Sequence, residues 1–265
     1  MIHKAKKSLG QNFLKSEPAL RAMCEAGNLN ANDVVLEIGP GKGALTAKLL
    51  EKASKVIAIE KDRALVTFLK EKFKNEIENK KLELIEGDCL EFEPASYKLG
   101  SGEYKIIANI PYNITGAIFK KFLSGNEKPG VMVLLVQKEV AMRIVARDKK
   151  ESILSLSVKL YGTPKYIMKV GKRFFSPSPK VDSAIIAITD IDSTHANSLD
   201  RKFFEVIKAG FAHKRKVLRK NLEILAPIDA IDEVFEKLNI GKSARAEDLP
   251  LAIWLTVTVY LSKYL

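Results

Sequence analysis

Short apolar runs alternate with amphipathic stretches along the first two thirds of the chain. Aliphatic and β-branched runs that end at glycine or polar residues are typical of buried strands, whereas a 3.6-residue period is typical of helices. Seven such runs stand at residues 34–38, 56–59, 82–86, 105–108, 131–136, 166–170 and 181–188. Helical patterns separate the first five runs, which predicts a mostly parallel sheet with helices on both faces. The last two runs have no long helix between them and predict an antiparallel pair at one edge.

The pattern changes after Ile188. Residues 189–198 are polar and typical of a linker, and every strong pattern beyond them is helical. These helical patterns stand at residues 201–211, 214–225, 230–238 and 249–261. The sequence therefore predicts an α/β domain at residues 1–190 and a small all-α domain at residues 191–265.

Composition adds a partner class to this picture. The 265-residue chain carries 44 Lys and Arg against 32 Asp and Glu, a formal charge of +12. Apolar residues make up 46% and charged residues 29%, the balance of a folded globular protein rather than a disordered one. The surplus of positive charge favours a polyanionic partner, and nucleic acid is the commonest one in the cytosol. The alternative is solubility charge spread over solvated faces.

Cysteine usage and the lack of long apolar segments indicate the compartment. Cys24 and Cys89 form neither a disulfide framework nor a metal cluster, and no Cys/His spacing resembles a zinc site. No segment reaches the ~20 apolar residues of a membrane helix, and no apolar stretch follows the basic N-terminus as in a secretion signal. We therefore expect a cytoplasmic protein that binds no metal ion and does not associate with a membrane. The sequence contains no heptad repeat of the kind that forms a coiled-coil dimer, so we expect a monomer.

A glycine-rich turn with the spacing G-x-G-x-G follows the first predicted strand. Gly39 and Gly41 permit positive φ and let a ligand approach the backbone closely. At the ends of the next two predicted strands, Glu60 is placed to accept both ribose hydroxyls of an adenosine and Asp88 to accept the adenine amine. Both NAD and S-adenosylmethionine fit this arrangement. The missing third glycine of the dinucleotide motif favours S-adenosylmethionine, which has no pyrophosphate to bind.

The fourth predicted strand ends in a loop suited to an adenine substrate. The exocyclic amine of adenine is a poor nucleophile, because its lone pair is delocalised into the ring. The side-chain carbonyl of Asn109 and the backbone carbonyl of Ile110 can each accept one of its N–H bonds and aim the lone pair at a methyl sulfonium. Pro111 fixes the preceding carbonyl, and the ring of Tyr112 can stack on a flipped-out base. Alignment and electrostatics would then supply most of the acceleration. The alternative is a proline turn with an aromatic plug.

Five motifs occur in order along almost the whole chain. They are KSLGQNFL (residues 7–14), EIGPG (37–41), NIPYNI (109–114), FSPSPKVDS (175–183) and GFAHKRKVLRKNL (210–222). Together they resemble the ribosomal RNA adenine N6,N6-dimethyltransferase family, and the last one is similar to the basic signature of its C-terminal domain.

The resemblance implies a Rossmann-like methyltransferase domain with a seven-stranded sheet, followed by a helical RNA-binding domain. It places contacts to S-adenosylmethionine at Asn12, Leu14, Gly39, Glu60, Asp88 and Asn109. It also implies that Phe175 and Tyr112 sandwich the target adenine. The implied activity is dimethylation of two adjacent adenosines in the last hairpin loop of small-subunit ribosomal RNA, during assembly of that subunit.

Two alternatives stay open. A sister branch methylates one adenine of large-subunit RNA and confers macrolide resistance; Ile110 and the pair at residues 42–43 favour it, whereas Pro40, residues 113–114 and residues 214–222 favour the small-subunit enzyme. A non-catalytic ribosome-assembly factor would keep the fold without turnover, although the intact cofactor residues argue against lost activity. A DNA adenine methyltransferase is disfavoured, because no target-recognition domain of useful size is present.

Three groups of basic residues are candidate RNA contacts. One precedes the expected cofactor lid, one flanks Phe175, and one is a run without acids in the helical domain. Their members are Lys4, Lys6 and Lys7; Lys172, Arg173 and Lys180; and Lys208, Lys214, Arg215, Lys216, Arg219 and Lys220. In a helix Arg215 and Arg219 would share one face, and such a stripe is typical of phosphate contact. A solvated charge run explains one such group, whereas three favour RNA binding.

Overall fold

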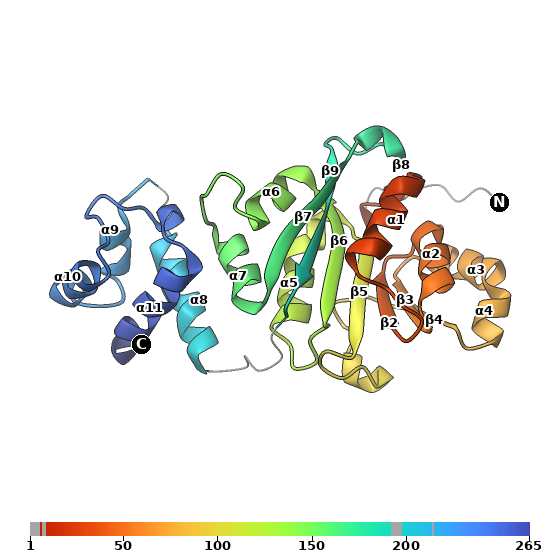
Figure 1. Ribbon diagram of the computed structural model, residues 1–265, viewed down its shortest axis with the longest axis horizontal. Coiled ribbons are helices and arrows are strands. Elements are labelled where there is room, and N and C mark those ends of the chain that lie inside the picture. Colours follow the sequence, from red (N-terminus) through yellow and green to blue (C-terminus); the bar gives the residue numbers. More distant parts are fainter. Residues whose placement is uncertain (1–5, 7–8, 192–197, 214) are drawn as a thin grey trace. The chain divides into compact units, whose positions relative to one another are not determined.

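Figure 1 shows the computed structural model, which describes residues 6, 9–191, 198–213 and 215–265. Its backbone forms two compact units. The first runs to Ala141 and resumes at Gly162 through the last strand, and the second contains residues 142–161 and the C-terminal helices. This division differs from the one expected at residue 190, because residues 142–161 group with the helical unit, whose core includes Leu156.

A seven-stranded sheet forms the centre of the first unit, within the described residues. Its order is β4-β3-β2-β5-β6-β9-β7. The strands are β2 (Val34–Ile38), β3 (Lys55–Glu60), β4 (Leu82–Glu86), β5 (Tyr104–Asn109), β6 (Val131–Gln137), β7 (Thr163–Val170) and β9 (Ser183–Thr189). The first five are parallel, and β9 is antiparallel to both β6 and β7. The mostly parallel sheet and the antiparallel pair at one edge are therefore confirmed.

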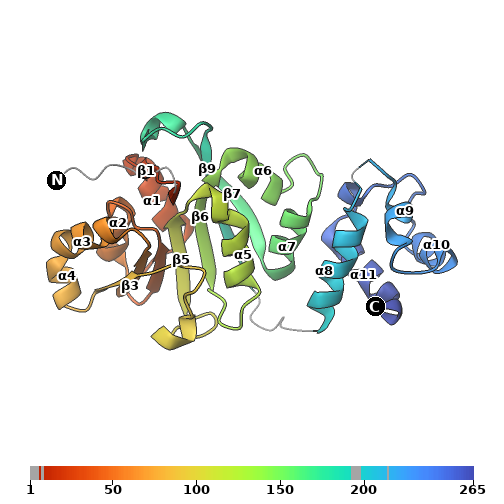
Figure 2. The ribbon, with the colours of Figure 1, turned by 180° about the vertical axis from the view of Figure 1, so that it is seen from behind.

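Helices cover both faces of this sheet, as the alternating pattern predicted. They are α1 (Glu17–Ala26), α2 (Ala44–Lys52), α3 (Arg63–Lys72), α4 (Lys74–Glu78), α5 (Thr115–Leu123) and α6 (Lys138–Ile144), the last of which passes from the first unit into the second. Helix α1 packs on β6, β7 and β9, and α5 is seen on the opposite face in Figure 2. Because both faces are covered, the central strands read as continuous apolar runs rather than alternating ones.

Local sequence sets where the helices begin. Ser16 caps α1 by accepting a hydrogen bond from the N–H of Ala19, and Asp62 caps α3 in the same way through Ala64. Two very short strands, β1 (Phe13–Leu14) and β8 (Phe175–Ser176), pair antiparallel outside the main sheet. The hydrophobic pattern predicted neither of them, because two residues are too few to show a period.

The second unit is helical. Its helices are α7 (Ile153–Tyr161), α8 (Ser198–Gly210), α9 (Leu218–Leu222), α10 (Ile228–Lys237) and α11 (Leu251–Leu261). Trp254 is fully buried at its centre, with its ring stacked on Phe211 at 5.7 Å between centroids. A Cβ on Gly210 would come within 2.3 Å of the Trp254 ring, so this close packing requires glycine there.

The predicted helix at residues 214–225 is wrong at its start. Helix α9 covers only Leu218–Leu222, because Val217 is extended and the N–H of Leu218 donates to the carbonyl of Ala244 at 2.8 Å. The Asn221 amide also donates to the Gly210 carbonyl at 2.6 Å, which ties the preceding loop to the end of α8. Arg215 therefore lies outside the helix and shares no helical face with Arg219.

The two cysteines are free and buried. Across the described part of the chain, no helix has the length and apolar character needed to cross a bilayer. The same residues contain no group of three His, Cys, Asp or Glu side chains that could hold a metal ion.

Candidate active site

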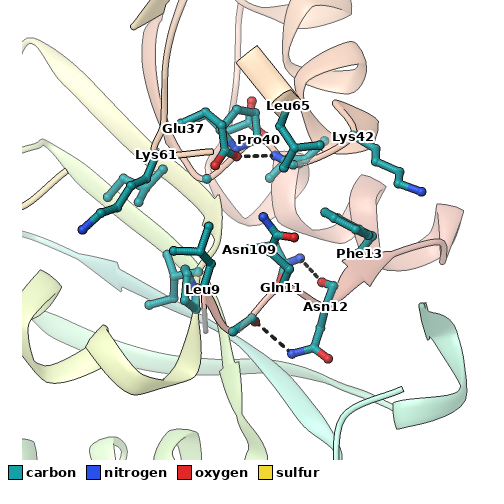
Figure 3. A pocket seen from close by; sticks show the side chains of 18 of the residues that line it. Leu9, Gln11, Asn12, Phe13, Glu37, Pro40, Lys42, Lys61, Leu65 and Asn109 are labelled. Atoms are coloured by element: carbon teal, nitrogen blue, oxygen red, sulfur yellow. Dashed lines mark hydrogen bonds between the residues drawn. The ribbon is translucent and has the colours of Figure 1, made fainter. Parts of the chain in front are cut away.

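A cavity of about 540 Å³ lies at the carboxyl ends of β2, β3 and β5, beside the N-terminal segment (Figure 3). The strand order reverses between β2 and β5, and open α/β sheets bind their ligands at such a point. The cavity has the size of a small-molecule site. Among its lining residues are Asn12, Leu14, Gly39, Gly41, Glu60, Asp88, Asn109, Ile110, Pro111 and Tyr112. The fold thus gathers all the residues predicted for the cofactor, and most of those predicted for catalysis, around one space.

The turn after β2 gives this cavity a wall of bare backbone. Gly39 and Gly41 have φ values of 67° and 58°, in the left-handed region that favours glycine. A Cβ on Gly39 would meet only the Cδ of Pro111, at 3.9 Å, and would otherwise project into the cavity. A Cβ on Gly41 would come within 2.9 Å of the Phe13 ring. Both positions therefore need glycine if a ligand is to lie against the turn.

Two carboxylates at successive strand ends face the cavity. Glu60, 6% exposed, accepts hydrogen bonds from the N–H groups of Gly41 at 3.1 Å and Asp62 at 2.9 Å. Burial raises the pKa of Glu60, and these bonds oppose the rise. Asp88 accepts a hydrogen bond from Lys61 Nζ at 2.8 Å, which lowers the pKa of Asp88. Each carboxylate oxygen has a second lone pair, so a ribose hydroxyl or an adenine amine can be added to these bonds.

A third carboxylate, Glu37, was missed in the sequence. It is the last but one residue of β2, is 1% exposed, and accepts a hydrogen bond from Thr46 Oγ1 at 2.6 Å. Burial raises the pKa of Glu37 to about 8, and a cation in the cavity would favour its ionised form. The available signal was an acid inside an otherwise apolar strand. A turn of bare backbone with the Glu60 and Asp88 carboxylates beside it fits a ligand that contains an adenosine.

The N-terminal segment, residues 9–15, forms one side of the cavity. Its strand β1 pairs with β8, and Gln11 Nε2 donates to the Asp62 carboxylate at 3.0 Å. Lys6 Nζ donates to the same carboxylate at 2.8 Å, and the Asp62 side chain is fully buried. Asp62 therefore fastens the segment to the start of α3. Lys42 reinforces this side, because its Nζ lies 5.0 Å from the centre of the Phe13 ring.

The amide of Asn109 is oriented by the N-terminal segment (Figure 3). Its Nδ2 donates to the backbone carbonyl of Asn12 at 3.1 Å. A carbonyl can only accept, so this bond fixes the nitrogen on the Asn12 side and turns Oδ1 of the planar amide away from it. Asn109 also lines the cavity, and its predicted role in holding the substrate amine stays a prediction.

The loop after Asn109 is held at several points. Pro111 has a φ of −60° and a ψ of 131°, and Tyr112 begins a short 3₁₀ turn that ends at Ile114. The Tyr112 carbonyl accepts a hydrogen bond from Thr115 Oγ1 at 3.0 Å. At its other end, the Tyr112 hydroxyl shares a hydrogen bond of 2.5 Å with Ser183 Oγ. The sequence included Ser183 in a motif but gave no reason for it.

Phe175 does not take the place expected for it. Its side chain is 5% exposed and packs in the apolar core with Leu14, its partner in the β1–β8 ladder. Neighbouring residues of a strand point to opposite sides, so burying Phe175 turns Ser176 to the cavity, where it is a lining residue. Phe174 is 37% exposed and has Arg173 5.0 Å from its ring. In this structure Tyr112, but not Phe175, is an aromatic wall of the cavity.

The basic residues of the first unit divide into exposed and paired ones. Lys172, Arg173 and Lys180 are exposed around β8. Lys6 is half exposed and forms an ion pair with Asp62, so its charge is already partly neutralised within the protein. Lys4 and Lys7 lie outside the described residues.

In the second unit, most of the predicted basic run is open to solvent. Its exposed members are Lys208, Arg215, Lys216 and Lys220, whereas Lys214 lies outside the described residues. Arg219 is different, because its guanidinium forms a two-bond ion pair with the Asp232 carboxylate. The 241–245 loop, joined to α9 by the Leu218–Ala244 bond, adds the exposed Lys242 next to the run. The sequence could not show either pairing, since both join distant segments.

The family model described as "Ribosomal RNA adenine dimethylase" matches residues 2–263 of the chain. Two curated relatives are named "Ribosomal RNA small subunit methyltransferase A". The protein of Dehalococcoides mccartyi (strain CBDB1) is 40% identical, over 95% of this chain and 86% of its own. That of Fusobacterium nucleatum subsp. nucleatum is 38% identical, over 95% of both chains.

Solved structures share the fold over almost the full length. A dimethyladenosine transferase from Plasmodium falciparum superposes with a TM-score of 0.80 at 28% identity, covering 95% of this chain and 98% of that one. The 23S rRNA methyltransferase ErmE superposes with a TM-score of 0.77 at 24% identity, covering 95% and 100%. At that identity the second likeness concerns the fold alone. The α/β methyltransferase architecture with a helical C-terminal unit is thereby confirmed.

Proposed function

The chain belongs to the ribosomal RNA adenine dimethylase family, and on this premise we propose that it dimethylates the N6 amines of two adjacent adenosines in the 3′-terminal hairpin loop of small-subunit (16S) ribosomal RNA. The name carried by the relatives at 38–40% identity supports the small-subunit substrate. We further propose that the protein acts as a monomer in the cytoplasm, on the immature small subunit.

S-adenosylmethionine would occupy the cavity. Its ribose hydroxyls suit Glu60, its adenine amine suits Asp88, and Asn12 and Leu14 of the N-terminal segment would close over it, with Gly39 and Gly41 against it. When bound, it supplies an electrophilic methyl group on a sulfonium. The carboxylates of Glu60 and Asp88 at the cavity, and a glycine turn that keeps side chains out of it, support this choice.

In the proposed mechanism, Asn109 orients the target amine. Its Nδ2 is committed to the Asn12 carbonyl at 3.1 Å, so its Oδ1 is free to accept an N–H bond of the target amine. The Ile110 carbonyl can accept the other N–H, and Pro111 holds that carbonyl in place because its φ is fixed. Two acceptors draw the amine nitrogen towards tetrahedral geometry and aim its lone pair. A strong base is unnecessary, because the nitrogen becomes acidic once it is alkylated. The orientation of Asn109 is the observation on which the proposal chiefly rests.

We assign the other predicted residues to binding of the RNA or to support of its site. Tyr112 offers its ring to the flipped-out adenine, and Phe175 supports the site from behind by packing with Leu14. Exposed basic residues in both units would neutralise phosphates. These are Lys172, Arg173, Lys180, Lys208, Arg215, Lys216 and Lys220.

The test compares two substrates and one variant. The purified protein is incubated with S-adenosylmethionine and either immature small subunits or large-subunit RNA, and the modified adenines are located by mass spectrometry. Two dimethylated adenosines in the small-subunit hairpin are expected, with no transfer to large-subunit RNA. Asn109→Ala should abolish transfer while cofactor affinity falls only partly. Methylation of large-subunit RNA alone would identify the resistance activity, and cofactor binding without transfer to either RNA would identify an assembly factor.

A further inference from the structure

The ring of Tyr112 is held at both of its ends. Its backbone follows Pro111, and its carbonyl accepts the hydrogen bond from Thr115. Its phenol oxygen lies 2.5 Å from Ser183 Oγ, 71 residues further along the chain. The phenol oxygen lies on the axis about which χ2 turns the ring, so a bond at that oxygen fixes χ1 and with it the place and direction of the ring axis. The hydrogen bond to Ser183 therefore holds the ring at one position beside the cavity.

Ser183 is itself rigidly placed. It is the first residue of β9, where it pairs with Gln137 of β6 on one side and Val170 of β7 on the other. Its side chain is fully buried, so water cannot easily replace its hydroxyl as a partner for the phenol. Hydroxyls that are buried and mutually bonded hold their geometry, because breaking the pair leaves both unsatisfied.

The residue before Ser183 anchors the loop that carries Phe175. The Asp182 carbonyl accepts a hydrogen bond from the N–H of Lys138 at 2.9 Å. Its carboxylate accepts one from the N–H of Lys172 at 3.0 Å and pairs with Lys169 Nζ at 2.9 Å. The end of the FSPSPKVDS motif thus fixes its own loop through Asp182 and reaches the catalytic loop through Ser183.

We propose that Ser183 is a positioning residue for methyl transfer: its hydroxyl fixes the position of the Tyr112 ring on which the target adenine stacks. The inference rests on the proposed function, since it assigns Ser183 an effect on the same adenine. Burial raises the pKa of the Tyr112 phenol, so the phenol stays protonated and retains a proton for this bond.

The test removes the bond from either side. Ser183→Ala deletes one hydroxyl and Tyr112→Phe deletes the other while keeping the ring. Each should lower kcat for the small-subunit RNA about tenfold, which is the size expected for one buried hydrogen bond. The double variant should also lose about tenfold rather than a hundredfold, because the two changes break the same bond. The Kd for the cofactor, measured by titration calorimetry, should stay at the wild-type value.

A matched control separates positioning from stability. Ser155 is also fully buried but lies in α7 of the other unit. Ser155→Ala should lower the thermal midpoint while leaving kcat unchanged. Losses that multiply in the double variant, or a wild-type kcat in Tyr112→Phe, would overturn the inference. The Tyr112→Phe result alone decides the question if Ser183→Ala does not fold. A wild-type protein that methylates neither RNA would instead contradict the proposed function.

Discussion

Replacing Asp62 by asparagine should weaken cofactor binding, although Asp62 does not line the cavity. The Asp62 carboxylate accepts hydrogen bonds from Gln11 of the N-terminal segment, from Lys6, which precedes that segment, and from the N–H of Ala64 in α3. Asparagine keeps one oxygen for the helix cap, and it caps helices about as well as aspartate. Its NH₂ group, however, would replace Oδ2 and cannot accept the bond from the Gln11 amide. Lys6 shares Oδ1 with the Ala64 N–H and would lose its ion pair, because asparagine carries no charge. The change therefore releases the segment but spares the helix.

The size of the effect follows from these contacts. A hydrogen bond to a charged acceptor contributes about 1.5–3 kcal/mol, and the Gln11 bond ends on a fully buried carboxylate. The Lys6 side chain is 50% exposed, so solvent screening reduces its pair to at most about 1 kcal/mol. A loss of about 2 kcal/mol in docking the segment corresponds to about thirtyfold weaker cofactor binding, since Asn12 and Leu14 are carried on that segment.

Calorimetric titration with S-adenosylhomocysteine, the product left when the proposed cofactor gives up its methyl group, measures the Kd at this site. Gln11→Ala should produce a loss similar to that of Asp62→Asn, and the double variant should lose no more than the larger single loss. Asp62→Ala should additionally lower the free energy of unfolding by about 1 kcal/mol, because it removes the cap of α3. Wild-type affinity in Asp62→Asn, or a loss there without one in Gln11→Ala, would refute the idea that Asp62 fastens the segment.

Three further predictions follow from the same contacts. Gly41→Ala should weaken cofactor binding in the same titration, because φ is +58° there and the new Cβ would lie 2.9 Å from the Phe13 ring. Lys220→Ala should lower the slope of log K for RNA binding against log salt concentration by about one unit. Arg219 is already paired with Asp232, so Arg219→Ala should lower thermal stability and leave that slope unchanged. The Glu37 pKa rises on folding from 4.5 to about 8 because of burial. Between these values the folded state holds a proton that the unfolded state releases, so the free energy of unfolding should fall as pH rises; urea titrations should show a flatter profile in Glu37→Gln.

The hydrophobic pattern predicted much of the fold of the first unit. Apolar runs bounded by turns located the seven main strands to within a few residues, because strands buried on both faces carry a strong and continuous signal. The grouping of the residues predicted for the cofactor around one cavity followed from the same logic. Carboxyl ends of parallel strands meet at one edge, so Gly39, Glu60 and Asn109, each at or just after a strand end, had to converge once the sheet was correct.

Where the pattern was weak, the predictions erred. A run rich in lysine and arginine is compatible with a helix or a loop, and residues 215–217 were assigned to a helix that begins only at Leu218. The deciding contacts are a backbone bond to Ala244 and the Asn221 amide bond to the end of α8. Such bonds link segments that are remote in sequence, and no local period records them.

The position of Phe175 shows why a motif can name a residue without giving its direction. A side chain on a strand points one way or the other according to the ladder it joins, and β8 pairs with β1 so that Phe175 lies opposite Leu14. Both are buried, and moving Phe175 to the cavity would mean sliding the ladder by one residue. That slip would move Phe175 out of the apolar core that it shares with Leu14 and expose apolar area that the present register covers. The burial of Leu14 and Phe175 therefore sets the register of the β1–β8 ladder, and under the proposed function it leaves the Tyr112 ring as the aromatic surface on which an incoming adenine would align.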